Sequence, residues 1–263
     1  MSKPLVMGIL NVTPDSFSDG GLFFDHNVAI AKGLEMIKQG ANIIDVGGES
    51  SRPGADVVSE DEELRRVLPV IKYLSNFTRV SIDTVKPNVA RESIDAGASL
   101  INDISASLDY VAAEKKAGYV VMHMQGTPQS MQQNPHYEDV VNQVYEFLIQ
   151  GAKKASEIGI EEVWIDPGIG FGKTDQHNLT LLNQLSKLVQ SPYPVLIGTS
   201  RKGFLGRIAP LQNGQPAPVN QRLEASLATA TWAMAQGCQM VRVHDVEPTC
   251  QAAELVGENF GEK

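Results

Sequence analysis

Short, nearly continuous apolar runs alternate along the chain with longer segments in which apolar residues recur at helical spacing. Such runs are typical of parallel strands that are covered on both faces. We expect eight strands, at residues 5–10, 43–46, 79–82, 100–103, 120–122, 163–165, 194–197 and 240–245. We expect helices at residues 25–39, from 59 past 71, at 86–96, 108–117, 137–158, 179–189 and 223–236, and from 248 onward.

This order of elements predicts the fold class. Strands that alternate with helices form a parallel sheet, because each helix carries the chain back to the same edge. Eight such units in 263 residues predict an α/β protein, a (β/α)8 TIM barrel that forms a single domain over residues 1–263. The alternative is a doubly wound open sheet in two halves. No break in composition indicates a linker.

Glycine and serine mark several expected helix ends. Glycine adopts positive φ without a steric penalty and therefore often follows the last turn of a helix. Five of the expected strands follow such a glycine. These glycines are Gly40, Gly97, Gly118, Gly159 and Gly237. Ser59 and Glu62 have the spacing of a capping box, in which each side chain caps the backbone of the other.

Composition and charge narrow the function classes. Apolar residues make up 42% of the chain, and the net charge is −9. Nucleic-acid binding usually requires a basic face, so we do not expect it here, although local Arg and Lys can still bind a small anion. No apolar run reaches the roughly 18 residues of a membrane span, and the first residues lack a signal-peptide pattern. We expect a cytoplasmic protein that binds no membrane.

Polar residues stand where the expected strands end. In a barrel of parallel strands the active site lies at these carboxyl ends. The residues there are Asn11, Asp45, Asp83, Asn102, Asp103, His123, Asp166, Lys202, Arg242 and His244. Helix capping explains Asp or Asn at such positions, but it does not explain Lys202, Arg242 and His244. The strand ends therefore predict a polar active site.

The sequence leaves open which functions the charged residues at the strand ends have. Arg242 and His244 share one face of the last strand, because side chains alternate. With Lys202 they favour an anion such as a phosphate, and the alternative is that Arg242 pairs with a neighbouring Asp. Asp83 and Asp166 are expected across the barrel mouth. They can be metal ligands, general bases or bidentate acceptors for a guanidine-like edge, and the residues alone do not decide.

A glycine-rich loop follows the sixth strand, with the sequence Asp166-Pro167-Gly168-Ile169-Gly170-Phe171-Gly172-Lys173. Proline cannot donate to a sheet, so the strand must end at Pro167. The glycines let the backbone approach a ligand closely. The loop predicts part of a polar ligand pocket, with a solvated turn as the alternative.

Other chemistries are less well supported. The five histidines lack H-x-H or H-x-x-x-H spacing, and Cys238 and Cys250 are isolated, so a metal cage built from the protein alone is not expected. The chain also lacks a G-x-S-x-G nucleophile motif. His123 follows an apolar run, and we expect a structural histidine rather than a base.

Eight segments together resemble the dihydropteroate synthase family of pterin-binding enzymes. In chain order they are residues 11–21, 47–54, 81–84, 101–103, 122–124, 166–173, 200–202 and 242–245. They include Asn-Val-Thr-Pro-Asp-Ser-Phe-Ser-Asp-Gly-Gly and Gly-Gly-Glu-Ser-Ser-Arg-Pro-Gly. Because the matches are ordered and extend from end to end, the resemblance is specific.

The resemblance implies a transferase of folate biosynthesis. The family joins 6-hydroxymethyl-7,8-dihydropterin pyrophosphate to p-aminobenzoate and releases pyrophosphate and 7,8-dihydropteroate. By this likeness Asp83, Asn102 and Asp166 accept from the pterin edge, and Lys202 contacts the ring. The ring would also contact Ile104, Met122, Phe171, Leu196, Gly198 and Arg242.

The resemblance also implies sites for the other reactants. The pyrophosphate would contact Asn11, Arg52, Arg242 and His244, with Mg²⁺ held by Asn11 and Asp19. The p-aminobenzoate would contact Ser51, Arg52, Pro53, Phe171, Ser200 and Lys202. Some relatives have Thr at position 51 and a hydroxyl at position 203, where this chain has Ser51 and Gly203. This leaves open how the carboxylate of p-aminobenzoate is held, and Ser200 and the start of the following helix are the candidates.

The resemblance further implies a homodimer and two loops, residues 16–21 and 50–54, that close over the site and exclude water. We expect these loops to become ordered when ligands bind. Two alternatives share the barrel, namely a pterin-dependent (methyltetrahydrofolate) methyltransferase and a catalytically silent pterin-binding protein. The first would not need Arg52, Arg242 and His244 or Mg²⁺.

Overall fold

The computed structural model describes residues 3–13, 26–50 and 57–257. Eight parallel strands form one sheet in the order β6-β5-β4-β3-β2-β1-β8-β7. They are β1 (Leu5–Asn11), β2 (Ile43–Gly47), β3 (Arg79–Asp83), β4 (Leu100–Asp103), β5 (Gly118–Met122), β6 (Val163–Asp166), β7 (Leu196–Ile197) and β8 (Met240–Val243). A parallel bridge between Ile165 of β6 and Val195, the residue before β7, joins the first and last strands of this order and closes the sheet. The predicted barrel is therefore confirmed, and the open sheet is wrong.

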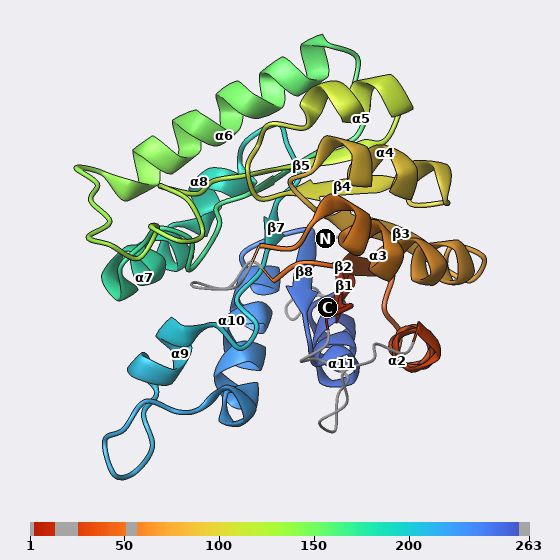
Figure 1. Cartoon of the computed structure of the whole chain (residues 1–263). Coiled ribbons are helices and arrows are strands. Elements are labelled where there is room, and N and C mark those ends of the chain that lie inside the picture. Colours follow the sequence, from red (N-terminus) through yellow and green to blue (C-terminus); the bar gives the residue numbers. More distant parts are fainter. Residues whose placement is uncertain (1–2, 14–25, 51–56, 258–263) are drawn as a thin grey trace.

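Helices surround the barrel (Figure 1). They are α2 (His26–Lys38), α3 (Glu60–Leu74), α4 (Pro87–Asp95), α5 (Asp109–Lys115), α6 (Val140–Glu157), α7 (Asp175–Asn183), α8 (Leu185–Val189), α9 (Gly203–Ile208), α10 (Leu223–Ala235) and α11 (Val246–Gly257), with a 3₁₀ turn at Val219–Gln221. The expected strict alternation of eight strands with eight helices is wrong in detail. The helix expected over residues 179–189 is divided at Gln184, and α9 is additional.

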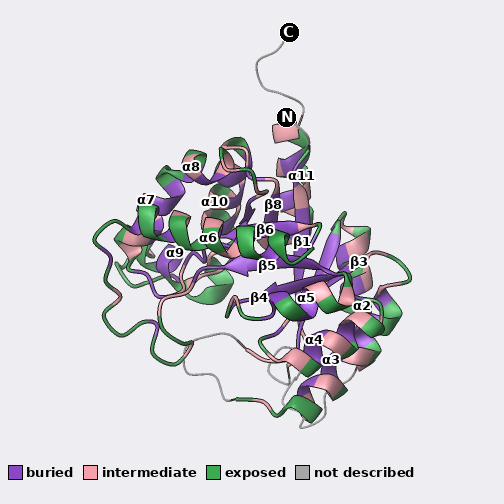
Figure 2. Ribbon diagram, turned by 90° about the horizontal axis from the view of Figure 1, so that it is seen from above, coloured by how far each residue is buried: buried purple, intermediate pink, exposed green. Residues whose placement is uncertain are grey.

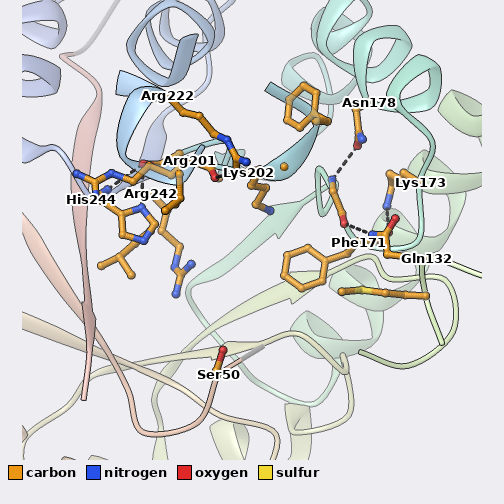
Figure 3. Close-up of a pocket in the computed structure, with 18 of the residues that line it drawn as sticks. Ser50, Gln132, Phe171, Lys173, Asn178, Arg201, Lys202, Arg222, Arg242 and His244 are labelled. Carbon is orange, nitrogen blue, oxygen red and sulfur yellow. Dashed lines mark hydrogen bonds between the residues drawn. The ribbon is translucent and has the colours of Figure 1, made fainter. Parts of the chain in front are cut away.

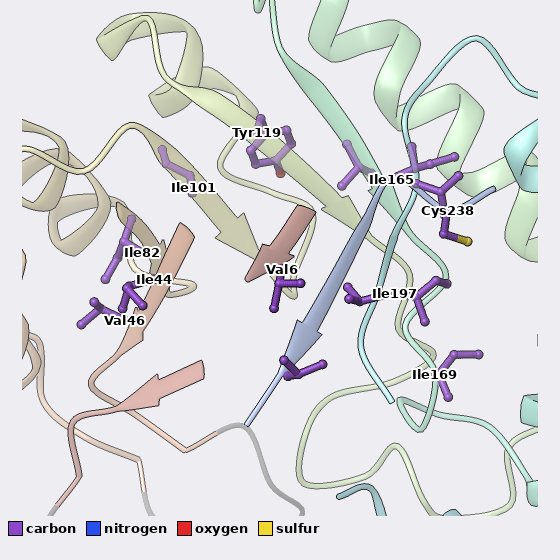
Figure 4. Packing of buried hydrophobic residues seen from close by; sticks show 14 of the residues in the cluster. Val6, Ile44, Val46, Ile82, Ile101, Tyr119, Ile165, Ile169, Ile197 and Cys238 are labelled. Atoms are coloured by element: carbon purple, nitrogen blue, oxygen red, sulfur yellow. The ribbon is translucent and has the colours of Figure 1, made fainter. Parts of the chain in front are cut away.

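The strands are mostly buried, whereas the outward faces of the helices are exposed (Figure 2). Strand side chains that point outward, such as Ile44, Ile82 and Ile165, pack against the helices (Figure 4). Alternate side chains point inward and form a second apolar cluster, consisting of Met7, Ile43, Leu100, Val120, Trp164, Leu196 and Met240. Within the described ranges no helix is both long and apolar enough to cross a bilayer.

Four of the five predicted glycine positions have the expected backbone. Gly40, Gly97, Gly159 and Gly237 have φ between 95° and 115°. The prediction for Gly118 is wrong, because Gly118 is the first residue of β5 and Lys116, with φ of 53°, follows the last residue of α5. A lysine at positive φ carries a steric cost that glycine avoids, so sequence reasoning selected the nearby glycine.

The predicted capping box at the start of α3 is half confirmed. The Ser59 hydroxyl accepts from the backbone N–H of Glu62 at 3.3 Å. The Glu62 carboxylate instead accepts from the guanidinium groups of Arg65 and Arg66, each at 2.7 Å. Two charge-assisted bonds outweigh one bond to a backbone N–H.

An ion pair crosses the barrel at the amino ends of the strands. The Arg79 guanidinium donates to both carboxylate oxygens of Glu162, at 2.8 and 2.5 Å. The Trp164 indole N–H also donates to Glu162, at 2.7 Å. This bidentate pair lies below the inward apolar cluster, so the barrel is filled at one end and opens at the other.

Candidate active site

A cavity of about 590 Å³ opens at the carboxyl ends of the strands, where the sequence predicted a site. The residues from the sequence prediction that line it are Asn11, Asp83, Phe171, Gly198, Ser200, Lys202, Arg242 and His244. Figure 3 shows Arg242 and His244 on one side of the cavity, Phe171 on the other and Lys202 between them. Strand ends that are distant in sequence thus contribute to one site.

A second cavity, of about 510 Å³, adjoins the first, since Ser50 and Asp83 line both. Ile104 and Met122, which were predicted to contact a pterin ring, line this second cavity and not the first. The predicted residues are therefore divided between two neighbouring cavities.

Three further predicted residues are buried and line neither cavity. Asn102 donates from its amide to Asp45 at 3.0 Å, and Asp166 accepts from the backbone N–H of Gly168 at 2.7 Å. Leu196 is fully buried in the inward apolar cluster. It lies two residues before Gly198, so it supports the cavity from within the barrel rather than lining its wall.

Four predicted site residues lie outside the described residues, namely Asp19, Ser51, Arg52 and Pro53. The same holds for the expected loop at residues 16–21 and for most of the loop at 50–54. Their assigned roles stay predictions.

Arg242 is held by two carboxylates. Its Nε donates to Asp45 at 2.6 Å, and its Nη2 donates to Asp83 at 2.5 Å. The pairing of Arg242 with a neighbouring Asp, left open by the sequence, is thus present, and Arg242 lines the cavity as well. Guanidinium bonds to two acids fix the orientation of this side chain.

Asp45 stood among the strand ends but was not assigned a role. It is completely buried and accepts from both Arg242 and Asn102 with the same oxygen, Oδ2. It therefore orients two residues that were assigned to a ligand. Sequence reasoning missed this role because Asp45 and Arg242 are 197 residues apart, and only closure of the barrel brings them together.

Burial shifts the acid–base properties of the site. Burial, together with the neighbouring acids Asp45, Glu63 and Asp103, raises the pKa of Asp83 to about 7, although Arg242 opposes the shift. Burial also raises the pKa of Asp166. The pKa of Lys202 is lowered to about 8, chiefly by burial. Ionisable groups with such shifts in a cleft are typical of functional sites.

Lys202 and Phe171 form a contact inside the cavity. The Lys202 Nζ lies 4.3 Å from the centre of the Phe171 ring and donates to the carbonyl oxygen of Ile169. Ile169 and Phe171, the two residues that Lys202 contacts, both belong to the glycine-rich loop after β6. The predicted ligand pocket at this loop is consistent with their position, and the loop is not a simple solvated turn.

Lys173 locks that loop to the loop after β5. Its side chain is 2% exposed, and its Nζ lies 2.9 Å from His123 Nδ1, 2.9 Å from the Phe171 carbonyl oxygen and 3.1 Å from that of Gly168. Burial and Lys173 lower the pKa of His123 to about 3, so the imidazole is neutral and accepts from the lysine. The prediction of a structural His123 agrees with this geometry, and the supporting role of Lys173 was missed.

His244 and Ser200 are coupled across the ends of β7 and β8. The His244 Nδ1 lies 3.0 Å from the Ser200 hydroxyl, which also accepts from the His244 backbone N–H at 3.1 Å. This arrangement fixes the ring and directs it to the cavity that Asn11 and Arg242 also line. Three polar groups suited to an anion thereby converge.

The residues present fit a divalent cation only in part. Within the described part of the chain, no three His, Cys, Asp or Glu side chains are placed to hold a metal. Asn11 lines the cavity, and its amide oxygen is a suitable Mg²⁺ ligand. Mg²⁺ commonly takes few protein ligands and completes its shell with water and substrate phosphates. The site therefore fits a metal that arrives with a phosphorylated ligand.

Comparisons with known proteins agree with this geometry. The model of the family "Pterin binding enzyme" matches residues 7–244. A dihydropteroate synthase of Escherichia coli is 44% identical and aligns with 100% of this chain and 94% of its own. A Xanthomonas albilineans dihydropteroate synthase solved with 4-aminobenzoic acid superposes with a TM-score of 0.90 at 40% identity, over 99% of this chain and 94% of that one. The same enzyme in complex with 7,8-dihydropteroate gives 0.86 at 38% identity, over 99% and 95%.

Proposed function

Since the chain belongs to the dihydropteroate synthases of the pterin-binding family, we propose that it joins 6-hydroxymethyl-7,8-dihydropterin pyrophosphate to p-aminobenzoate and releases pyrophosphate and 7,8-dihydropteroate. The observation that carries this proposal is the single cavity in which Asp83, Lys202, Arg242 and His244 meet. It combines Asp83, an acceptor for a pterin edge, with cations for a leaving pyrophosphate.

One assay tests the proposal against its two alternatives. Pyrophosphate release is measured with and without p-aminobenzoate, and the pterin product is identified. Release that depends on p-aminobenzoate and yields 7,8-dihydropteroate supports a synthase. Methyl transfer without pyrophosphate would indicate a methyltransferase, and binding without turnover would indicate a silent barrel.

The pterin ring is proposed to bind at the inner end of the site. Asp83, Asn102 and Asp166 accept from its amino-pyrimidinone edge, and Lys202 contacts its oxygen and nitrogen. Its faces lie against Ile104, Met122, Phe171, Gly198 and Arg242. Adjacent cavities that share Asp83 support this placement, because the ring can lie where they meet.

The pyrophosphate is proposed to leave before the amine attacks. Asn11, Arg242 and His244 line the cavity, and Arg52 is assigned from the family motif. Mg²⁺ held by Asn11 and Asp19 would help to neutralise the charge on the leaving group. Among the described residues the arrangement offers cations for the charge of the leaving group and no activated nucleophile, which favours a dissociative reaction.

The p-aminobenzoate is proposed to lie against Phe171 and Lys202, near Ser200, with Ser51, Arg52 and Pro53 completing the site. An aryl amine is a weak base, so its attack on a delocalised cation needs no strong general base. The contact between Lys202 and Phe171 supports an aromatic ring here.

The family also suggests the state in which the chain works. We propose a homodimer that acts in the cytoplasm. Sedimentation analysis of the purified chain measures its mass in solution, and a monomer at micromolar concentration would contradict the dimer.

Asp83→Asn and Asp166→Asn are each expected to weaken pterin binding by about 1.5–3 kcal/mol, the range for a hydrogen bond to a charged partner. Both acids end barrel strands, and both are buried or nearly so at the site. Calorimetry with a non-reacting pterin measures the effect. Wild-type affinity in both variants would remove the two carboxylates from the pterin site.

Pterin affinity is also expected to depend on pH. Asp83 has a pKa raised to about 7, so below that pH it carries a proton that must leave before it can accept from two N–H groups. The dissociation constant should therefore rise roughly tenfold between about pH 8 and about pH 6. Asp83→Asn is the control: it should bind weakly and lack this rise, and only the smaller change of opposite sign that protonation of Lys202, with its pKa of about 8, would cause should remain. Equal wild-type affinity at both pH values would contradict the assignment.

A further inference from the structure

Glu63, on α3, is a buried carboxylate that none of the proposed ligand sites uses. It is 1% exposed, and its side chain reaches the end of β3, where Thr84 follows the proposed pterin acceptor Asp83. The Thr84 hydroxyl donates to Glu63 Oε1 at 2.8 Å. The same hydroxyl oxygen accepts from the backbone N–H of Lys86 at 3.2 Å and closes a short turn directly after the strand. Glu63 therefore fixes the chain at the residue that follows Asp83.

Glu63 also contacts the loop after β2. A Cβ on Gly48 would lie 2.8 Å from the Glu63 Cγ, so glycine allows this loop to pass close to α3. The Gly48 carbonyl oxygen accepts from Arg66, three residues farther along the same helix, at 2.9 Å. Strands β2 and β3 are neighbours, with Gly47 opposite Asp83. α3 thus holds the carboxyl ends of both strands from outside the barrel.

One ammonium group serves two carboxylates in this cluster. Lys86 pairs with Glu63 and also with Glu49, which follows Gly48 in the loop after β2. One positive charge does not neutralise two carboxylates, so the cluster keeps a negative charge. The second cavity is lined by Glu49, Glu63, Asp83 and Lys86. Its wall next to the proposed pterin acceptor is therefore acidic.

The charged side chains that act on Asp83 are Arg242, Lys202, Asp45, Asp103 and Glu63. The two cations favour the ionised form of the Asp83 carboxyl, and the three acids favour its protonated form. Asp45 and Asp103 belong to strands β2 and β4, whereas Glu63 lies on a helix outside the barrel. The charge of Glu63 can therefore be removed while the strand ends keep their own residues.

We propose that Glu63 is a positioning residue of the pterin site, which fixes the direction of Asp83 through Thr84 and sets the charge around it. The proposal rests on the proposed function, because it concerns an acceptor of the pterin edge. Glu63 itself does not contact the pterin, since its carboxylate is occupied by Thr84 and Lys86. An acid on an outer helix thus controls the readiness of an acceptor inside the barrel mouth.

The first test measures the affinity for 6-hydroxymethylpterin, which lacks the pyrophosphate, by calorimetry at about pH 6 and about pH 8. Glu63→Gln keeps the size of the side chain and an oxygen for the Thr84 hydroxyl but removes the charge. The change of about tenfold expected for the wild type should fall below about threefold, because Asp83 then loses its proton at a lower pH. Glu60→Gln is the control. Glu60 is an exposed acid on the same helix, where it accepts from Asn88 at 3.0 Å, and its variant should keep the wild-type pH dependence.

A second variant separates position from charge. Thr84→Val keeps the shape of the side chain but removes the hydroxyl that joins the end of β3 to Glu63. It should weaken pterin binding by about three- to tenfold at about pH 8, while the pH dependence stays close to that of the wild type. In both variants kcat at saturating substrates should stay within about threefold of the wild type, since neither change touches a residue assigned to the pyrophosphate.

The outcomes separate this role from a purely structural one. Wild-type pH dependence in Glu63→Gln, or wild-type affinity in Thr84→Val, would overturn the proposal. An equal loss of kcat and of pterin affinity in Glu63→Gln would mean that Glu63 only supports the fold. If Glu63→Gln does not fold, Glu49→Gln leaves Lys86 to neutralise Glu63 alone, and it should shift the pH dependence in the same direction by a smaller amount. No shift in Glu49→Gln would then count against the proposal.

The proposed function is checked separately with the wild-type chain. If the wild type binds no 6-hydroxymethylpterin, the proposed pterin site fails. In that case the titration of the Asp83 carboxyl, followed by NMR in the wild type and in Glu63→Gln with ¹³C-labelled aspartate, still decides whether Glu63 acts on Asp83. Equal titration midpoints in the two proteins would exclude it.

Discussion

His244→Ala is expected to lower kcat by about 10- to 1000-fold, while a pterin without the pyrophosphate still binds with nearly wild-type affinity. His244 lines the cavity with Asn11 and Arg242, and its ring is fixed by Ser200 at 3.0 Å. It is therefore placed to stabilise the leaving group and not the ring. Single-turnover kinetics measure the first effect, and calorimetry measures the second.

Arg242→Ala is the comparison, and it should impair both properties. Arg242 contacts Asp83 and Asp45, so its loss alters the pterin acceptors as well as the charge near the pyrophosphate.

The order of bond breaking is tested in the wild type with ring-substituted p-aminobenzoates at saturation. A steep dependence of the single-turnover rate on amine basicity would mean that the amine attacks in the rate-limiting step, and the dissociative reaction would be rejected.

Gly168→Ala is expected to destabilise the fold by more than about 3 kcal/mol and to abolish most activity. A Cβ at this position would lie 2.0 Å from the carbonyl oxygen of His123, and the residue has φ of +62°. Because the obstacle is backbone, a rotamer change cannot relieve it. The displaced loop carries Phe171 and is anchored by Lys173, so the site would be disturbed with the fold.

Gly159→Ala separates the steric effect from the backbone effect. Gly159 also has positive φ, at +95°, but a Cβ there would meet nothing within 4 Å. Its cost should be about 1 kcal/mol, from the left-handed backbone alone. Urea unfolding of both variants measures the difference. Equal stabilities would show that the two loops after β5 and β6 are not tightly interlocked.

The barrel could be predicted from the sequence because local patterns specify its elements. Buried parallel strands read as apolar runs, and glycines at positive φ mark most of the helix ends. The errors occur where tertiary contacts outweigh local signals. Lys116 takes the left-handed position expected for Gly118, and β7 has only two residues although four were expected.

The candidate site could be predicted in part for the same reason. Strand ends are visible in sequence, and Asn11, Asp83, Lys202, Arg242 and His244 do line one cavity. The roles of Asp45 and Lys173 could not be predicted, because each depends on a contact across the barrel or between loops. Charge compensation is a property of the assembled site, and no local spacing reports it.

Very little backbone pairing closes the barrel between β6 and β7. One bridge, Ile165 to Val195, joins them, whereas β8 forms ladders with both β1 and β7. The chain can therefore be divided at the bend over residues 191–193 into two polypeptides that still share the β1–β8 ladder. Asp83 and Asp166 would belong to one fragment, and Lys202 and Arg242 to the other. Co-expression of the two fragments would then make activity a measure of their reassembly, because neither fragment carries a whole site.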